Sequence, residues 1–121
     1  MKKILVVDDN VVNLKVVDKF LKINEDYKPV LIPNGKKALQ FLEKNTPDLI
    51  LLDVLMPEMD GFQVLEEIKK MPTAESVPVL FLTADEDAAL QEKVKSAGGD
   101  GLLKKPFNKD DLLNMVSQYL A

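Results

Sequence analysis

The chain has 121 residues, of which 46% are hydrophobic and 30% are charged, and its formal net charge is −4. This length and composition are typical of one globular domain and differ from those of disordered chains, so we expect residues 1–121 to form a single domain. The negative charge argues against non-specific binding to nucleic acid, which needs a basic surface.

Two chemically important residue types do not occur in the sequence. The absence of cysteine excludes disulfides and thiolate chemistry, and the absence of histidine excludes the usual general base and zinc ligand. The apolar runs, such as 49–52, are far shorter than the ~20 residues of a membrane span, and 4–7 is too short for a signal peptide. We therefore expect a cytoplasmic protein without membrane contact, whose chemistry uses carboxylates, hydroxyls and lysines.

Short apolar strands alternate with amphipathic helices along the whole chain. Met71-Pro72 and Gly98-Gly99 are expected to end helices, and Asn108 is expected to cap the last one. The acidic residues 85–87 are interpreted as charges that stabilise a helix N-terminus. The expected strands are 4–7, 29–32, 49–52, 79–82 and 102–103, and the expected helices are 10–23, 34–44, 60–71, about 86–97, and 108–120.

This alternation predicts the fold class. Five strand-helix units with short connections imply a mostly parallel sheet with right-handed crossovers and helices on both faces. The chain is therefore expected to be a doubly wound, five-stranded α/β domain.

The first expected helix carries more apolar residues than one face needs. Val16, Val17 and Phe20, followed by Leu21, recur at helical spacing and are assigned to the core. Val11 and Leu14 lie one turn apart and offset from that face. We interpret these two residues either as an apolar patch that a helix of a partner protein touches or as a peripheral packing pair.

Polar residues follow four of the five expected strands. Asp8 and Asp9 follow the first strand, Asp53 the third, Thr83 the fourth and Lys105 the fifth. Ligands of open parallel sheets bind outside the carboxyl ends of the strands. If the first and third strands are neighbours, three carboxylates converge there, and they then need a cation or protonation. Oxygen ligands of this kind, completed by waters and a phosphate, suit Mg²⁺ better than Ca²⁺.

The same edge offers what a phosphoryl group needs. A Thr83 hydroxyl and a Lys105 ammonium both suit phosphate oxygens, so we predict a phosphoryl-transfer site in which Asp53 forms an acyl phosphate. Each residue also has a plainer interpretation: Asp9 or Asp60 as a helix cap, Thr83 as a loop hydroxyl, and Lys105 as a solvated lysine. Their joint placement at one sheet edge favours the site.

Four segments carry a family resemblance that extends over essentially the whole chain. Residues 4–10, 48–61, 78–84 and 105–107 resemble, in order, type and spacing, the motifs of response-regulator receiver domains of two-component signalling. The resemblance implies a flavodoxin-like fold with strand order 2-1-3-4-5. It also implies that the chain is a signalling module rather than an enzyme. Such a module is phosphorylated by a sensor histidine kinase or phosphotransfer protein and acts on a downstream protein target or output domain.

The resemblance assigns metal ligands residue by residue. Asp9 corresponds to the direct Mg²⁺ ligand, and Asp8 to an acid that acts mainly through metal-bound water. Asp53 corresponds to the phosphoacceptor and a further ligand. Leu55 would contribute only its backbone carbonyl, so its aliphatic side chain is no objection.

The resemblance also assigns the residues that respond to transfer. Thr83 would donate a hydrogen bond to the phosphoryl oxygen, and Lys105 would pair with Asp53 before transfer and with the phosphoryl group afterwards. An output surface would then change. The position of Leu102 is commonly aromatic in the family, and leucine has no ring to report the movement of Thr83.

Three other functions fit the sequence less well. A flavodoxin-like cofactor binder is disfavoured because Asp8 and Asp9 would repel a flavin phosphate and no tryptophan is present to stack on the flavin. A Mg²⁺-dependent phosphohydrolase with Asp53 as nucleophile lacks room for a substrate pocket. A degenerate receiver that serves only protein interaction would not need all five site residues. Because residues 1–121 carry no output domain, we expect either a stand-alone receiver or a fragment of a larger protein, and we favour the stand-alone receiver.

Overall fold

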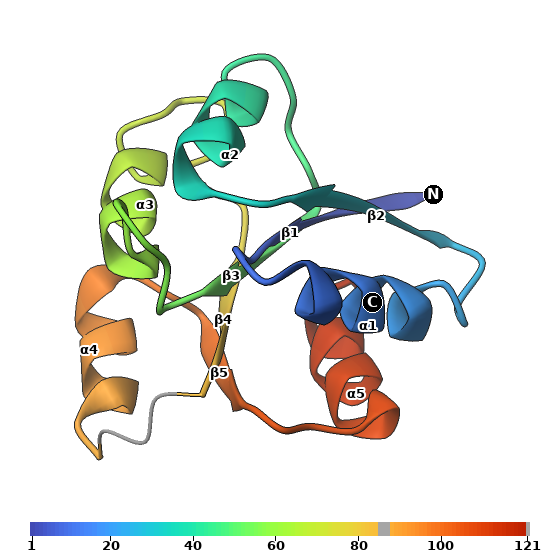
Figure 1. Cartoon of the computed structure of the whole chain (residues 1–121). Helices are drawn as coiled ribbons and strands as arrows, with labels where there is room; N and C mark the ends of the chain where they lie inside the picture. Colours follow the sequence, from blue (N-terminus) through green and yellow to red (C-terminus); the bar gives the residue numbers. More distant parts are fainter. Residues whose placement is uncertain (85–87, 121) are drawn as a thin grey trace.

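The computed structural model describes residues 1–84 and 88–120, over which strands and helices alternate (Figure 1). The expected start of a helix near residue 86 and the acidic stretch 85–87 lie outside the described residues. The strands are β1 (Lys2–Val7), β2 (Tyr27–Ile32), β3 (Leu49–Asp53), β4 (Val79–Thr83) and β5 (Gly101–Lys104). The helices are α1 (Val11–Leu21), α2 (Gly35–Leu42), α3 (Gly61–Ile68), α4 (Leu90–Ala97) and α5 (Lys109–Leu120).

The strands form one parallel sheet in the order β2-β1-β3-β4-β5, which confirms the predicted fold class and strand order. The register pairs Val7 of β1 with Leu52 of β3, and Asp53 with Leu82 of β4. The chain winds to one side of β1 to form β2 and to the other side to form β3. The residues that follow β1 therefore lie beside the end of β3.

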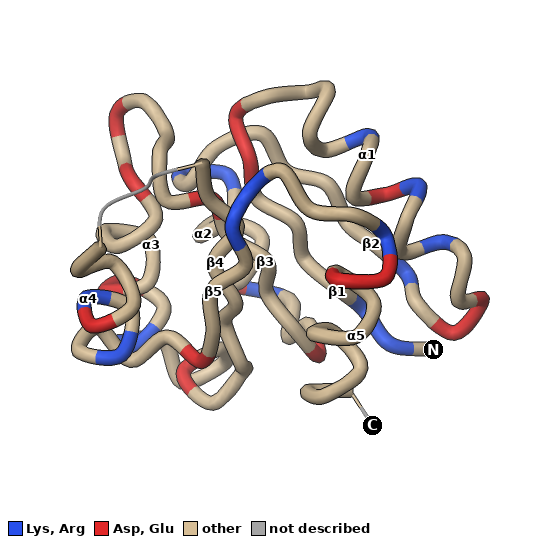
Figure 2. The backbone as a smooth tube through the Cα atoms, turned by 90° about the horizontal axis from the view of Figure 1, so that it is seen from below, with Lys and Arg blue, Asp and Glu red and all other residues tan. Residues whose placement is uncertain are grey.

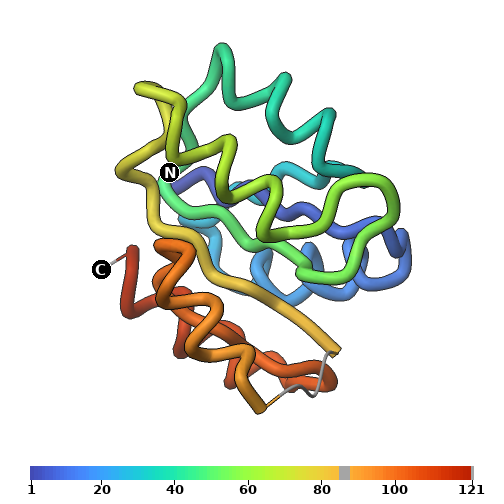
Figure 3. Tube along the Cα trace, turned by 90° about the vertical axis from the view of Figure 1, so that its left-hand side faces the viewer, coloured from blue at the N-terminus to red at the C-terminus, as the bar shows by residue number. Residues whose placement is uncertain are grey.

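Helices cover both faces of the sheet (Figures 1 and 3). One core lies between the sheet and α2, α3 and α4, and the other between the sheet and α1 and α5. Alternate residues of β3 enter each core: Ile50 and Leu52 the first, Leu49 and Leu51 the second. Burial on both faces explains why the central strands are continuous apolar runs.

Polar caps fix where the helices begin. The side chains of Asn10, Asn34 and Asp60 accept backbone N–H groups of the first turns of α1, α2 and α3. Asn108 caps α5 as predicted, since its Oδ1 accepts the Asp111 N–H at 2.8 Å. Gly98 ends α4 in the left-handed conformation at φ 91°, also as predicted.

Gly61 brings α3 close to the end of β3. A Cβ atom at this position would clash with the Asp53 carbonyl oxygen and lie 2.9 Å from the Phe81 ring. Because the backbone approach leaves no room for a side chain, only glycine allows α3 to start here.

The predicted core face of α1 is partly wrong. Leu14 is 5% exposed and packs into the core with Val17 and Leu21, whereas Val16 is 40% exposed. The helix turns its 14-17-21 stripe to the sheet, a spacing as regular as the predicted one. Leu14 therefore cannot belong to a surface patch, while Val11 remains exposed.

Charged residues of both signs are spread over the backbone (Figure 2). Within residues 1–84 and 88–120, no helix is both long enough and apolar enough to cross a bilayer.

Candidate functional site

The carboxyl edge of the sheet gathers the predicted site residues. Asp8 follows β1, Asp53 ends β3, Thr83 ends β4 and Lys105 follows β5. Asp8, Asp53 and Thr83 are the buried polar residues of the described chain, at 3%, 6% and 0% exposure. Polar groups are buried at a cost unless they have partners, so their contacts show what the site is built to hold.

Three carboxylates converge at this edge, as the sequence predicted. One oxygen from each of Asp8, Asp9 and Asp53 lies within 4.8 Å of the other two. Asp9 is exposed, whereas the other two are buried. Asn10 caps α1 through its own side chain and donates its backbone N–H to Asp8 Oδ1 at 2.9 Å. The capping interpretation of Asp9 is therefore wrong, and that of Asp60 is confirmed.

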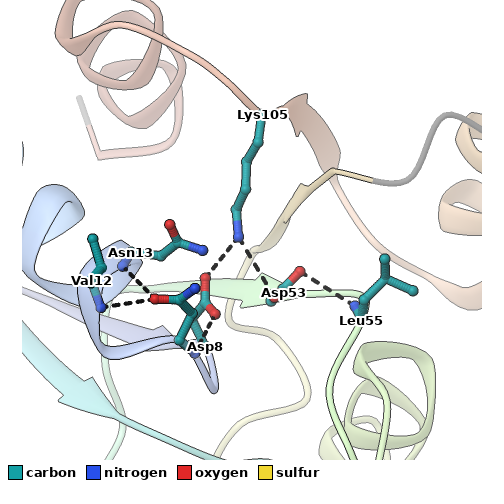
Figure 4. Close-up of polar contacts among 7 residues, drawn as sticks. Asp8, Val12, Asn13, Asp53, Leu55 and Lys105 are labelled. Atoms are coloured by element: carbon teal, nitrogen blue, oxygen red, sulfur yellow. Dashed lines mark hydrogen bonds and ion pairs between the residues drawn. The ribbon is translucent and has the colours of Figure 1, made fainter.

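Lys105 reaches two of the three carboxylates (Figure 4). Its Nζ lies 2.7 Å from Asp8 Oδ2 and 3.6 Å from Asp53 Oδ2. The shorter contact is a charge-assisted hydrogen bond, and the longer one is an ion pair without a hydrogen bond. The expectation of a pair with Asp53 thus holds in part, but the ammonium is nearer to Asp8.

Thr83 lies at the buried end of β4, between β3, which ends at Asp53, and β5, which precedes Lys105. Its carbonyl oxygen accepts the Lys105 backbone N–H at 2.7 Å. The backbone that positions Lys105 is therefore tied directly to the end of β4.

The electrostatics of the edge act most strongly on Asp53. Burial and the neighbouring charge of Asp8 raise the pKa of Asp53 from 3.8 to about 6, although Lys105 and the Leu55 N–H pull the pKa down. The Leu55 N–H donates to Asp53 Oδ1 at 3.3 Å. The raised pKa means that burial, together with the Asp8 charge, outweighs the stabilisation of the Asp53 carboxylate by Lys105 and the Leu55 N–H.

This donor set fits a hard divalent cation. Three carboxylates gather at this edge, two of them are buried, and Lys105 supplies one positive charge against three negative ones. Mg²⁺ prefers such oxygen ligands in combination with waters and phosphate oxygens. A contact of the Leu55 carbonyl with a metal stays a prediction.

An apolar groove lies beside the carboxylates, between α1 and the segment that follows β5. Lys105 forms part of both the groove and the site, so a partner that fills the groove also reaches the mouth of the site. The residues that line it are Asn13, Val16, Val17, Ala84, Lys105, Pro106 and Phe107.

Sequence reasoning missed two features of the site. It did not expect the Asn10 N–H on Asp8, and it assigned Val16 to the core, although Val16 lines the groove. An Asp two residues before a helix cap often accepts such a backbone hydrogen bond, which was the available signal for the first feature.

The comparison with family models adds independent evidence. The model described as the response regulator receiver domain matches residues 4–117. The chain belongs to the response regulator receiver domain family. It is a receiver domain of two-component signalling, homologous to the receiver domains of histidine kinases, and such domains are signalling modules rather than conventional enzymes.

Individual relatives agree with this assignment. The response regulator Rre1 of Synechocystis sp. is 34% identical over 118 residues, which cover 98% of this chain and 51% of Rre1. The chain thus spans about half the length of that relative. The chemotaxis protein CheY4 of Vibrio cholerae has a TM-score of 0.91 at 30% identity, with 98% of each chain covered.

A further solved structure bears on the metal. The receiver domain of the sensor histidine kinase PA1611 from Pseudomonas aeruginosa has a TM-score of 0.88 at 30% identity and covers 98% of this chain and 97% of its own. That structure is described with a magnesium ion coordinated in its active-site cleft. Receiver domains bind Mg²⁺ at an acidic pocket, and the chain has an acidic cluster of that type.

Proposed function

We propose that residues 1–121 are one receiver domain that accepts a phosphoryl group onto Asp53 from a phosphohistidine of a separate protein and thereby changes its output surface. The observation that carries the proposal is the setting of Asp53. It is a buried carboxylate at the end of a central strand, between two further carboxylates and the Lys105 ammonium.

The transfer chemistry follows from Asp53 as the nucleophile. A carboxylate oxygen of Asp53 attacks phosphorus, an O–P bond forms and the P–N bond of the phosphohistidine breaks. The electron pair goes to the imidazole, which takes a proton from solvent. Because residues 1–121 contain no histidine, the phosphohistidine must lie outside them, and a small phosphodonor is the other possible source.

Asp8, Asp9 and Asp53 would hold the divalent cation, with the Leu55 carbonyl as a further ligand. When bound, Mg²⁺ would offset the carboxylate charge and polarise the phosphoryl oxygens. Lys105 would pair with the phosphoryl group after transfer, and the Thr83 hydroxyl would donate to one of its oxygens. Movement of Thr83 would pass to β5 through the Lys105 N–H that its carbonyl accepts.

Two of the alternative functions, a degenerate receiver and a flavin binder, would need a different set of residues at this edge. A degenerate receiver would have no reason to keep the nucleophile, the cluster and the lysine together. A flavin binder would place a phosphate against Asp8 and Asp9, where like charges repel.

Phosphoryl acceptance can be measured on the chain alone. Incubation with acetyl phosphate and Mg²⁺ is expected to add one phosphoryl group, detected by intact-mass spectrometry. Chelation of Mg²⁺ with EDTA should prevent the addition, because the uncompensated carboxylates repel the incoming phosphate. Equal labelling with and without Mg²⁺ would contradict the metal-dependent part of the proposal.

The exposed face of α1 is proposed as the docking surface of the phosphodonor protein. Val12 and Val16 are 68% and 40% exposed, and Val16 lines the groove that Lys105 shares with the site. Exposed lysines on the same helix, Lys15 and Lys19, would suit an apolar partner face flanked by acidic residues.

Substitution of these valines should separate docking from chemistry. In the Val12→Ser and Val16→Ser variants, phosphorylation by a histidine kinase that labels the wild type is expected to slow by roughly tenfold, because interface energy concentrates in a few apolar anchors. Labelling by acetyl phosphate should not change. Ile23→Ser, an exposed position just beyond α1, is the matched control. Normal rates from both donors would remove this surface from consideration.

A further inference from the structure

The two ion pairs of Lys105 are unequal. The contact of its Nζ with Asp8 Oδ2, at 2.7 Å, is 0.9 Å shorter than the 3.6 Å contact with Asp53 Oδ2. Both residues of the shorter pair are largely shielded from water, with side-chain exposures of 15% for Lys105 and 5% for Asp8. In the metal-free protein the Lys105 ammonium therefore interacts more closely with Asp8 than with the nucleophile Asp53.

The pair with Lys105 completes the hydrogen bonding of Asp8. Its Oδ1 accepts the Asn10 N–H at 2.9 Å, and its Oδ2 accepts the Lys105 ammonium. The segments that hold the partners are themselves fixed, because Asn10 caps α1 and the Lys105 backbone is bonded to Thr83. A cation that binds the cluster of Asp8, Asp9 and Asp53 would therefore meet the Lys105 ammonium, which is already paired with Asp8. Figure 4 shows this pair of Lys105 and Asp8.

We propose that Lys105 is an internal counter-ion that competes with the divalent cation for Asp8, so that metal entry releases the lysine toward Asp53. This inference rests on the proposed function, since it takes the carboxylate cluster as the metal site. Asp53 Oδ2, 3.6 Å away, is the next carboxylate oxygen within reach of the released ammonium. The same exchange would neutralise Asp8 with the cation and bring Lys105 to the nucleophile.

The competition makes a prediction that runs against a purely supportive role for Lys105. If the lysine helped to build the metal site, its removal would weaken metal binding. If the lysine competes with the cation, its removal strengthens metal binding. A positive charge a few ångströms from the cation is then gone, and no ion pair has to break before the metal binds. The interaction of charges at such distances corresponds to a roughly tenfold or larger change in the dissociation constant.

The test is a calorimetric titration of the metal-free proteins with Mg²⁺ at pH 8. The dissociation constant of Lys105→Gln is expected to be at least about tenfold lower than that of the wild type. Lys105→Met removes the same charge with a different shape and guards against a folding defect of either variant, which circular dichroism would reveal. Lys104→Gln, an exposed neighbour with the same change in net charge, is the matched control and should bind like the wild type.

A double-mutant cycle locates the partner of the lysine without metal. Thermal melts of Asp8→Asn, Asp53→Asn and Lys105→Gln, and of the two double variants that contain Lys105→Gln, measure the two coupling energies. The coupling of Lys105 with Asp8 should exceed its coupling with Asp53. Equal or stronger coupling with Asp53 would overturn the inference.

The outcomes separate this inference from the proposed function. If the wild type binds Mg²⁺ and the Lys105 variants bind it equally well or more weakly, the competition is wrong and the metal site stands. If neither the wild type nor the Lys105 variants bind Mg²⁺, the metal site itself fails, and the competition fails with it.

Discussion

Mg²⁺ at millimolar concentration is expected to raise the melting temperature of the wild type by several degrees. The metal-free fold holds Asp8, Asp9 and Asp53 together, whereas the unfolded chain spreads them apart. A ligand that binds only the folded state stabilises it by about 2.7 kcal/mol at a hundredfold excess over its dissociation constant. For a domain of this size each kcal/mol corresponds to roughly 3–6 °C.

Removal of one ligand should shrink this increment. Asp9→Asn is expected to lose most of the Mg²⁺-induced rise, while its metal-free melting temperature increases only slightly, because the Asp9 carboxylate is exposed and its repulsion is screened. Asp60→Asn is the control: it removes one negative charge, and asparagine caps α3 about as well as aspartate. Thermal melts with and without Mg²⁺ that show equal increments for wild type and Asp9→Asn would contradict a role for Asp9 in the metal site.

Asp53→Asn is expected to stabilise the metal-free protein above pH 7. The pKa of Asp53 is raised to about 6 in the fold, so the folded state binds the proton more tightly than the unfolded chain, whose value is 3.8. Stability linked to this group is therefore highest below about pH 4, falls as the pH rises to 6, and stays low above it. Two pKa units correspond to a penalty on the order of 1–3 kcal/mol, which the amide removes.

The pH dependence distinguishes this effect from general tightening of the core. Urea unfolding of metal-free wild type and Asp53→Asn between pH 4 and pH 8 should give free energies of unfolding that converge near pH 4 and diverge toward pH 8. Asp60→Asn should follow the wild type. A constant difference across the range would show that the charge of Asp53 is not the cause, and a less stable variant at pH 8 would contradict the electrostatic account.

Most of the fold could be predicted because its signals are local. Continuous apolar runs such as 49–52 can be buried only between two layers, and the glycines at 98–99 and the asparagine at 108 mark helix boundaries directly. The strand order came from the family resemblance, since no local pattern specifies which strands are neighbours. The expected ends of strands were less accurate than their existence. β2 begins at Tyr27, two residues before the expected start, because an edge strand tolerates polar and proline residues.

The candidate site could be predicted because parallel strands bring their ends to one edge, so residue type at those positions carries the information. The orientation of α1 could not, because Val11, Val12 and Val16 make its first half apolar on several sides and two core faces fit equally well. The preference of Lys105 for Asp8 depends on where the segment after β5 crosses the sheet edge, which no pattern in the sequence encodes.

Acetyl phosphate labelling of Asp53→Asn tests the central claim most directly. Wild type, Asp53→Asn and Asp60→Asn would be incubated with Mg²⁺ and the donor, and the modified peptide identified by mass spectrometry. Because Asp53 is the carboxylate that combines burial at the end of β3 with the Asp8, Asp9 and Lys105 contacts, the account predicts one phosphoryl group on the peptide that contains residue 53 in wild type and Asp60→Asn, and none in Asp53→Asn. Undiminished labelling of Asp53→Asn would contradict it.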